Sequence, residues 1–210
     1  MNYLDAFMEA SVDKESTAAH EAAHFIAASH FGFPVGDKGV SIKWDGTEYS
    51  GFLDIDFKEV LRQDDPDCLS LDQYVAIRII GPLYELMRYR SLNEAELVKK
   101  DAAIKQIILR GRDDFGRVAQ DYELGAPDDL PTSLKLGRFF AGLYLGREID
   151  APNSEVRERA TASVALVRQL IQNYADDIDR FARVLCQKMN LSQDEVTAWL
   201  RDNFVRRNLS

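Results

Sequence analysis

Two of the three histidines in this 210-residue chain are four residues apart, in the run His20-Glu21-Ala22-Ala23-His24. On an α-helix, positions four apart share one face and lie one turn from each other. Two imidazoles placed in this way can each give one nitrogen to the same Zn²⁺ ion, at roughly 2.0–2.1 Å. The pattern HExxH therefore predicts that His20 and His24 bind zinc.

Glu21 follows the first histidine of the motif directly. Its position is rotated by about 100° around the helix axis, so we expect its carboxylate beside the metal and not on it. There it can hold a metal-bound water, whose pKa is lowered to about 7, and take its proton. Glu21 would then pass the proton to the leaving amine, which predicts a peptidase with Glu21 as general base.

A catalytic zinc site usually has three protein ligands and a water, and the third ligand is open at this point. His30 has the spacing of a longer zinc-protease pattern, but Ala27 stands where that pattern has a helix-breaking glycine. In a continuous helix His30 would face away from the other two histidines. Glu85, on a later expected helix, and Asp113 or Asp114, at a helix start, are the other candidates. Spacing alone does not choose between them.

The composition limits the classes of protein to consider. The chain is 46% hydrophobic and 29% charged, which is ordinary for a globular protein with a sizeable core. Lys and Arg number 26 against 35 Asp and Glu, for a formal net charge of -9. A general nucleic-acid binder needs a basic face, so we expect no nucleic-acid partner.

Cysteine usage and apolar stretches bear on the compartment. Cys68 and Cys186 are far apart and form no CxxC pattern, as expected in a reducing cytosol. The first residues, Met1 to Asp5, lack the basic-then-apolar build of a signal peptide. No apolar stretch approaches the roughly 18–20 residues that span a bilayer. These observations predict a cytoplasmic protein without a membrane span.

The elements that must position the motif begin with a helix over residues 13–31. Six alanines favour it, Asp13 or Ser16 can cap its start, and Gly32 followed by Pro34 is typical of its end.

Two segments that alternate apolar and polar residues follow this helix. They cover 40–44 and 49–57, and the turn signal Asp45-Gly46 lies between them. This pattern predicts a β hairpin, which needs helices packed against it to be stable.

Helical periodicity then continues from residue 69 to near the end of the chain. The first expected helices cover 74–87, which is interrupted or kinked at Gly81-Pro82, and 93–110. A third helix is capped by Asp113 or Asp114 and reaches toward Leu124, and a fourth covers 132–145. A long helix from 154, a helix over 176–189 and a last helix that begins at the capping box Ser192-Gln193-Asp194-Glu195 follow. The predicted fold class is mainly α with a small β hairpin or sheet (α+β). We expect a single domain over 1–210, with the active-site helix, sheet and core helices in 1–125 and a C-terminal helical bundle in 126–210.

The motif and several later segments resemble one family in chain order. The run Thr17 to His24 resembles the active-site helix of the FtsH-type AAA protease peptidase domain, whose usual form is HEAGH. The segments that are similar to later parts of that domain are Val40-Ser41-Ile42, Gly51-Phe52, Ile79 to Leu86, Gly111 to Phe115, and Cys186 to Val196. In the family's GASNDL segment the aspartate before the apolar residue is the third zinc ligand. The resemblance therefore implies Asp114 as the third ligand, with Asp113 as the fallback.

The resemblance has departures as well. Ala23 replaces the motif glycine, and Gly81-Pro82 replaces a double glycine. The phosphate-binding pattern GxxxxGK[ST] does not occur, so we expect a free-standing relative of the peptidase domain without the ATPase module or membrane anchor.

The resemblance implies a zinc-dependent peptidase that hydrolyses peptide bonds and is ATP-independent as an isolated chain. Its substrate would be a peptide or an unfolded protein, pairing as an extra strand on a sheet edge. Lys43 and Trp44, or the segment 49–53, are candidate edges, although an ordinary hairpin or core role is favoured for Trp44. A homo-oligomer or a separate ATPase partner remains open. The alternative is a catalytically inactive metal-binding interaction or regulatory module of the same fold.

Overall fold

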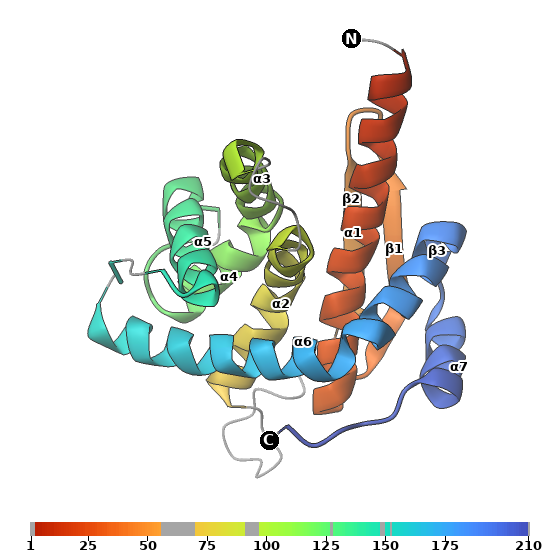
Figure 1. Ribbon diagram of the computed structural model, residues 1–210. Helices are drawn as coiled ribbons and strands as arrows, with labels where there is room; N and C mark the ends of the chain where they lie inside the picture. Colours follow the sequence, from red (N-terminus) through yellow and green to blue (C-terminus); the bar gives the residue numbers. More distant parts are fainter. Residues whose placement is uncertain are drawn as a thin grey trace. The chain divides into compact units, whose positions relative to one another are not determined.

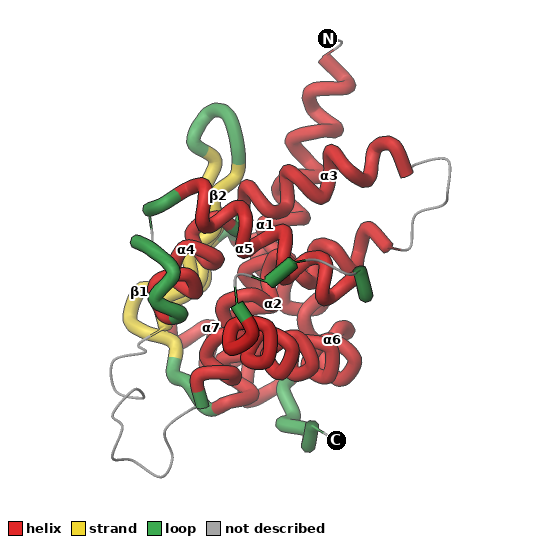
Figure 2. Tube along the Cα trace, turned by 90° about the vertical axis from the view of Figure 1, so that its left-hand side faces the viewer, coloured by secondary structure: helices red, strands yellow, loops and turns green. Residues whose placement is uncertain are grey.

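The computed structural model describes residues 3–55, 70–90, 97–126, 128–147, 150–151 and 153–209. It confirms a mainly helical fold with a small antiparallel sheet, whose strands are the yellow segments of Figure 2. The elements, labelled in Figure 1, are α1 (Tyr3–Phe31), β1 (Val35–Trp44), β2 (Tyr49–Ile55), α2 (Leu71–Arg90), α3 (Leu97–Arg110), α4 (Arg112–Asp121), α5 (Leu130–Leu145), α6 (Ser154–Lys188), β3 (Asn190–Leu191) and α7 (Gln193–Asn203).

The chain forms two compact units. One comprises Met1–Cys68 with Gln172–Ser210, and the other comprises Leu69–Ile171. The division expected at residue 125 falls inside the second unit, and a single domain over 1–210 stays a prediction. The first part of α6 belongs to the second unit and the remainder to the first.

In the first unit, α1 contains the whole HExxH motif and lies alongside β1 and β2 (Figure 1). The helix is longer than the expected 13–31, because residues 3–12 contain neither glycine nor proline to prevent it. It ends as expected before Gly32, whose φ of 89° is the left-handed conformation typical of a helix C-terminus.

The expected hairpin is present, and a third strand joins it. Trp44 pairs with Tyr49 and Ile42 with Gly51 in antiparallel register. The predicted end of the second strand, at residues 56 and 57, lies outside the described residues. On its other side β1 pairs with the short strand β3, which the sequence pattern did not indicate. Gly39 permits this pairing, since its φ is 65° and an added Cβ would lie 2.0 Å from the Leu191 carbonyl oxygen.

An aromatic cluster closes the core of the first unit. The ring of Phe25 on α1 lies 4.1 Å from that of Phe181 on α6, which in turn lies 4.9 Å from that of Trp199 on α7. The capping box predicted at the start of α7 is confirmed, with Ser192 and Glu195 each accepting a hydrogen bond from the other's backbone N–H. The ring contacts hold α7 and the C-terminal part of α6 against the motif helix.

The second unit is built from α2 to α5 and the first part of α6. The helix α2 continues through Pro82, so the expected interruption does not occur, and the alternative of a kink at Gly81-Pro82 stays a prediction. Gly137 on α5 permits close helix packing as expected, because a Cβ there would lie 2.7 Å from side-chain carbons of Ile108 and Phe115.

Two expectations about helix ends are corrected. The N-cap of α4 is Gly111, and it is neither of the two aspartates that were expected to cap this helix. The reason is that α3 ends at Arg110 and α4 begins at Arg112, so only Gly111 separates the two helices. Asp113 and Asp114 therefore lie in the first turn of α4. The two helices expected from residue 154 and over 176–189 are one continuous helix, α6, which contains no glycine or proline.

None of the described helices is both long enough and apolar enough to cross a membrane.

Candidate metal centre

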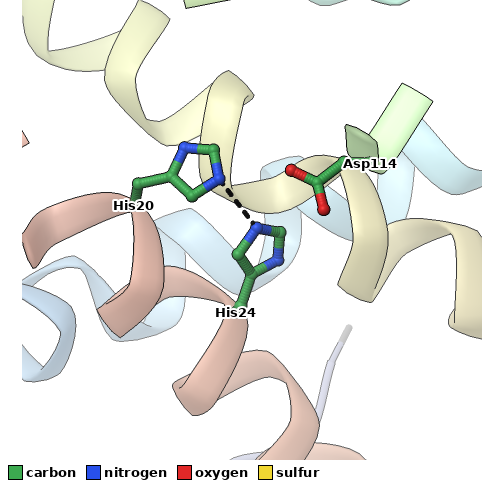
Figure 3. A group of neighbouring side chains, drawn as sticks. All are labelled: His20, His24 and Asp114. Carbon is green, nitrogen blue, oxygen red and sulfur yellow. Dashed lines mark hydrogen bonds between the residues drawn. The ribbon is translucent and has the colours of Figure 1, made fainter. Parts of the chain in front are cut away.

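The two motif histidines face each other on α1. Their Nε2 atoms are 3.0 Å apart, joined by the dashed line in Figure 3, and their ring centroids are 4.7 Å apart. Both side chains are buried. The i, i+4 spacing has therefore placed the two rings side by side, as the helix geometry requires.

The distance between the nitrogens fits a shared cation. In a neutral pair at 3.0 Å, one Nε2 donates its proton and the other accepts it. Around a tetrahedral zinc with bonds of ~2.0–2.1 Å, two ligand nitrogens are roughly 3.3–3.4 Å apart. The observed separation is thus a few tenths of an ångström shorter than that of two nitrogens on one zinc.

Asp114 supplies a third potential ligand atom. It lies in the first turn of α4 and is half-buried. One ligand atom from each of His20, His24 and Asp114 lies within 4.8 Å of the other two, and Figure 3 shows the three side chains. Two imidazole nitrogens and a carboxylate oxygen are ligands that zinc accepts, although iron, cobalt and manganese use the same types.

Glu21 is buried on the same helix and lies against strand β2. One turn earlier, the Thr17 hydroxyl donates a hydrogen bond to the Tyr49 carbonyl oxygen at 3.4 Å. Two residues further along the strand, Gly51 lies so close to Glu21 that a Cβ there would be 2.1 Å from Oε1. The carboxylate expected to act as base is thus held between its helix and the backbone of β2.

The other carboxylates that the sequence offered as third ligand have different surroundings. Glu85 is buried and accepts a hydrogen bond from Arg110. The side chain of Asp113 is 87% exposed and lies 3.6 Å from the Nε atom of Arg112. Neither belongs to the group of close ligand atoms found among the described residues.

His30 lies in a separate cluster. Its Nδ1 is 2.9 Å from the hydroxyl of Tyr174 on α6. Burial, and in second place the nearby Arg206 guanidinium, lowers the pKa of the imidazole below its ordinary value of 6.5. His30 therefore favours the neutral form, as suits a hydrogen-bonded side chain beside a positive charge.

Two residues that contact β2 or Glu21 beside the motif, Thr17 and Gly51, were not predicted from the sequence. For Thr17 no sequence signal was available, because a hydroxyl on a helix has many roles. For Gly51 a signal did exist, since an isolated glycine inside a strand pattern often marks a close approach of another group. Only the structure shows that the approaching group is the Glu21 carboxylate.

Comparisons with protein-family models, with curated proteins and with solved structures gave no match for this chain. The resemblance to the FtsH-type peptidase domain stays a prediction for this reason.

Proposed function

We propose that this protein is a zinc-dependent peptidase in which His20, His24 and Asp114 hold the metal and Glu21 is the general base. One observation carries the proposal: two buried imidazole nitrogens 3.0 Å apart, with an aspartate ligand atom in the same group, on a helix that also buries a glutamate next to the first histidine. This set of side chains is the one that metal-assisted peptide hydrolysis uses.

The protein side chains have distinct tasks in this proposal. When bound, zinc supplies a positive charge that acidifies water and polarises a peptide carbonyl. Glu21 accepts a proton from the attacking water and delivers it to the nitrogen of the leaving amine. Because Glu21 and the histidines are buried, the charges act at a site with little bulk water, where electrostatic interactions are stronger.

A sheet edge beside Glu21 supports an extended polypeptide as substrate. Within the described residues, β2 pairs with β1 on one side and is the outer strand of the sheet. It is also the strand against which the Glu21 side chain of α1 lies. An extended peptide that added to β2 by backbone hydrogen bonds would bring its peptide groups close to the base. Trp44 belongs to the central strand β1 and contacts Tyr49, so β2 is the better of the two candidate edges.

The proposal is tested by replacing Glu21 and keeping the metal ligands. We expect the purified chain to bind about one zinc per molecule and to cleave a fluorescently labelled unfolded polypeptide. Glu21→Gln should keep the zinc, because Glu21 is not a ligand, and lose at least about 100-fold in cleavage rate, as removal of a general base does. Metal content is measured by elemental analysis and cleavage by the release of labelled peptides.

Glu15→Gln is the matched control, since Glu15 is an exposed residue of the same helix. It should change neither zinc content nor cleavage. A Glu21→Gln variant that cleaves as fast as the parent would refute the mechanism. Stoichiometric zinc without any cleavage by the parent would favour the inactive metal-binding module, and absence of zinc would refute the site itself.

A further inference from the structure

Strand β2 and helix α1 advance side by side in a matched register. Thr17 contacts the backbone of Tyr49, and Glu21 contacts Gly51. Four residues of an α-helix rise about 6 Å, and two residues of a β-strand rise about 6.6–6.8 Å. The second contact therefore repeats the first at nearly the same spacing, so Glu21 meets the strand at a position that the register defines.

Gly51 leaves no room for any side chain. A Cβ at this position would lie 2.1 Å from Oε1, 2.4 Å from Cγ and 2.5 Å from Cδ of Glu21. Carbon atoms in favourable contact are about 3.5–4.0 Å apart. All three distances are therefore overlaps, and the three nearest atoms all belong to the same glutamate.

The backbone conformation does not explain the glycine. Gly51 is not among the glycines with positive φ, which are Gly32, Gly39, Gly46 and Gly146. It pairs with Ile42 in the regular part of the sheet, where other residue types are favoured over glycine. The requirement at position 51 is thus one of space, and the group that occupies the space is Glu21.

We infer that Gly51 is a positioning residue for Glu21: by lacking a side chain, it lets the carboxylate lie against the backbone of β2. This inference rests on the role proposed for Glu21. We expect a methyl group at position 51 to be compatible with folding, because the three nearest atoms belong to a side chain that can rotate. It would instead force the carboxylate to a new position while leaving His20 and His24 in place.

Cleavage kinetics of Gly51→Ala give the first test. We expect kcat to fall about 100-fold, the scale of a 1 Å misplacement of a reacting group, while KM and zinc affinity change by less than about threefold. Gly36→Ala is the matched control, since a Cβ at Gly36 would lie 2.4 Å from another carboxylate of the same sheet, that of Asp54. It should leave kcat unchanged. Wild-type kcat in Gly51→Ala would overturn the inference.

Thermal stability gives a second test that needs no activity. In the parent chain, Gly51→Ala should lower the melting temperature by about 2–4 °C, because it displaces a buried side chain. In a Glu21→Ala background the space is open, and the same change should leave the melting temperature equal or higher, since alanine suits a strand better than glycine. Equal shifts in both backgrounds would overturn the inference even if the peptidase proposal holds. Opposite shifts would support it even if the chain cleaves no substrate.

Discussion

All three histidines of this chain lie on α1, but the groups that face them differ between the HExxH motif and the C-terminal end of the helix. His20 and His24 face each other, with their Nε2 atoms 3.0 Å apart. His30 faces the hydroxyl of Tyr174, at 2.9 Å. Histidines of one helix thus have two kinds of surroundings: His20 and His24 belong to a candidate metal centre, and His30 makes a hydrogen bond to a residue of α6.

His30 belongs to a larger network of hydrogen bonds and ion pairs. The Tyr174 hydroxyl also contacts the backbone of Arg207, and the Arg207 guanidinium lies 3.1 Å from the buried carboxylate of Asp177. Asp177 also pairs with Arg180 on its own helix. This network joins α1 and α6 to the C-terminal segment after α7. A histidine becomes a metal ligand when other ligands face it, and its occurrence on the motif helix is not sufficient.

The largest expected difference between the motif histidines and His30 is the effect of their replacement on zinc affinity. His24→Ala should weaken zinc binding by more than about 100-fold, because outer-shell changes alone cost about 10–100-fold and this change removes a direct ligand. His30→Ala, on the same helix, should leave the affinity unchanged. Competition with a chromophoric chelator measures both. Equal losses in the two variants would mean that the histidines do not differ in the way the structure indicates.

The next effect concerns the two neighbouring aspartates of α4. Asp114→Ala should weaken zinc binding at least about tenfold, since Asp114 belongs to the group of close ligand atoms. Asp113→Ala is the matched control, because that side chain is 87% exposed. The same chelator competition measures both variants. An unchanged affinity in Asp114→Ala would show that another group completes the site.

A smaller effect is expected on stability at the His30 end. His30→Ala removes the hydrogen bond to Tyr174 and should lower the free energy of unfolding by about 1 kcal/mol. Urea denaturation of the metal-free protein measures it. Tyr174→Phe removes the other half of the same contact, so the double variant should lose less than the sum of the two single losses. Additive losses would contradict a direct interaction.

The smallest effect is a dependence of stability on pH. Because the pKa of His30 is lowered in the folded state, the unfolded chain binds a proton there first as the pH falls below the ordinary value of 6.5. The contribution of His30 to stability is then present above that pH and is lost as the pH falls through the lowered pKa. The unfolding free energy of the parent should decline more steeply from pH 7.5 to 5 than that of His30→Asn. Parallel declines would contradict the assignment.

Several features of the fold follow from local rules and were predicted from the sequence. The motif lies on a helix that ends just before Gly32, the turn at Asp45-Gly46 joins two strands, and Ser192 with Glu195 caps the last helix. Each of these depends on residues within one turn or one hairpin of each other, and intrinsic preferences decide such features. The prediction of two helices between residue 154 and residue 189 was wrong, because no glycine or proline separates them and the structure has the single helix α6 there.

The site was predictable in part for the same reason. The spacing of His20 and His24 requires a shared helix face, whatever the rest of the chain does. Asp113 and Asp114 are adjacent and differ by about 100° around the helix. Which of them points inward depends on how α4 packs, so the local sequence could not choose between them.

Tertiary structure alone decided the contacts between distant parts of the chain. Tyr174 is 144 residues from His30, and the strand β3 reaches β1 only because the last two elements fold back on the sheet. The closeness of Gly51 to Glu21 likewise depends on the register of a strand beside a helix. Helix periodicity and turn preferences act over a few residues, whereas these contacts require the chain to be packed before any of them exists.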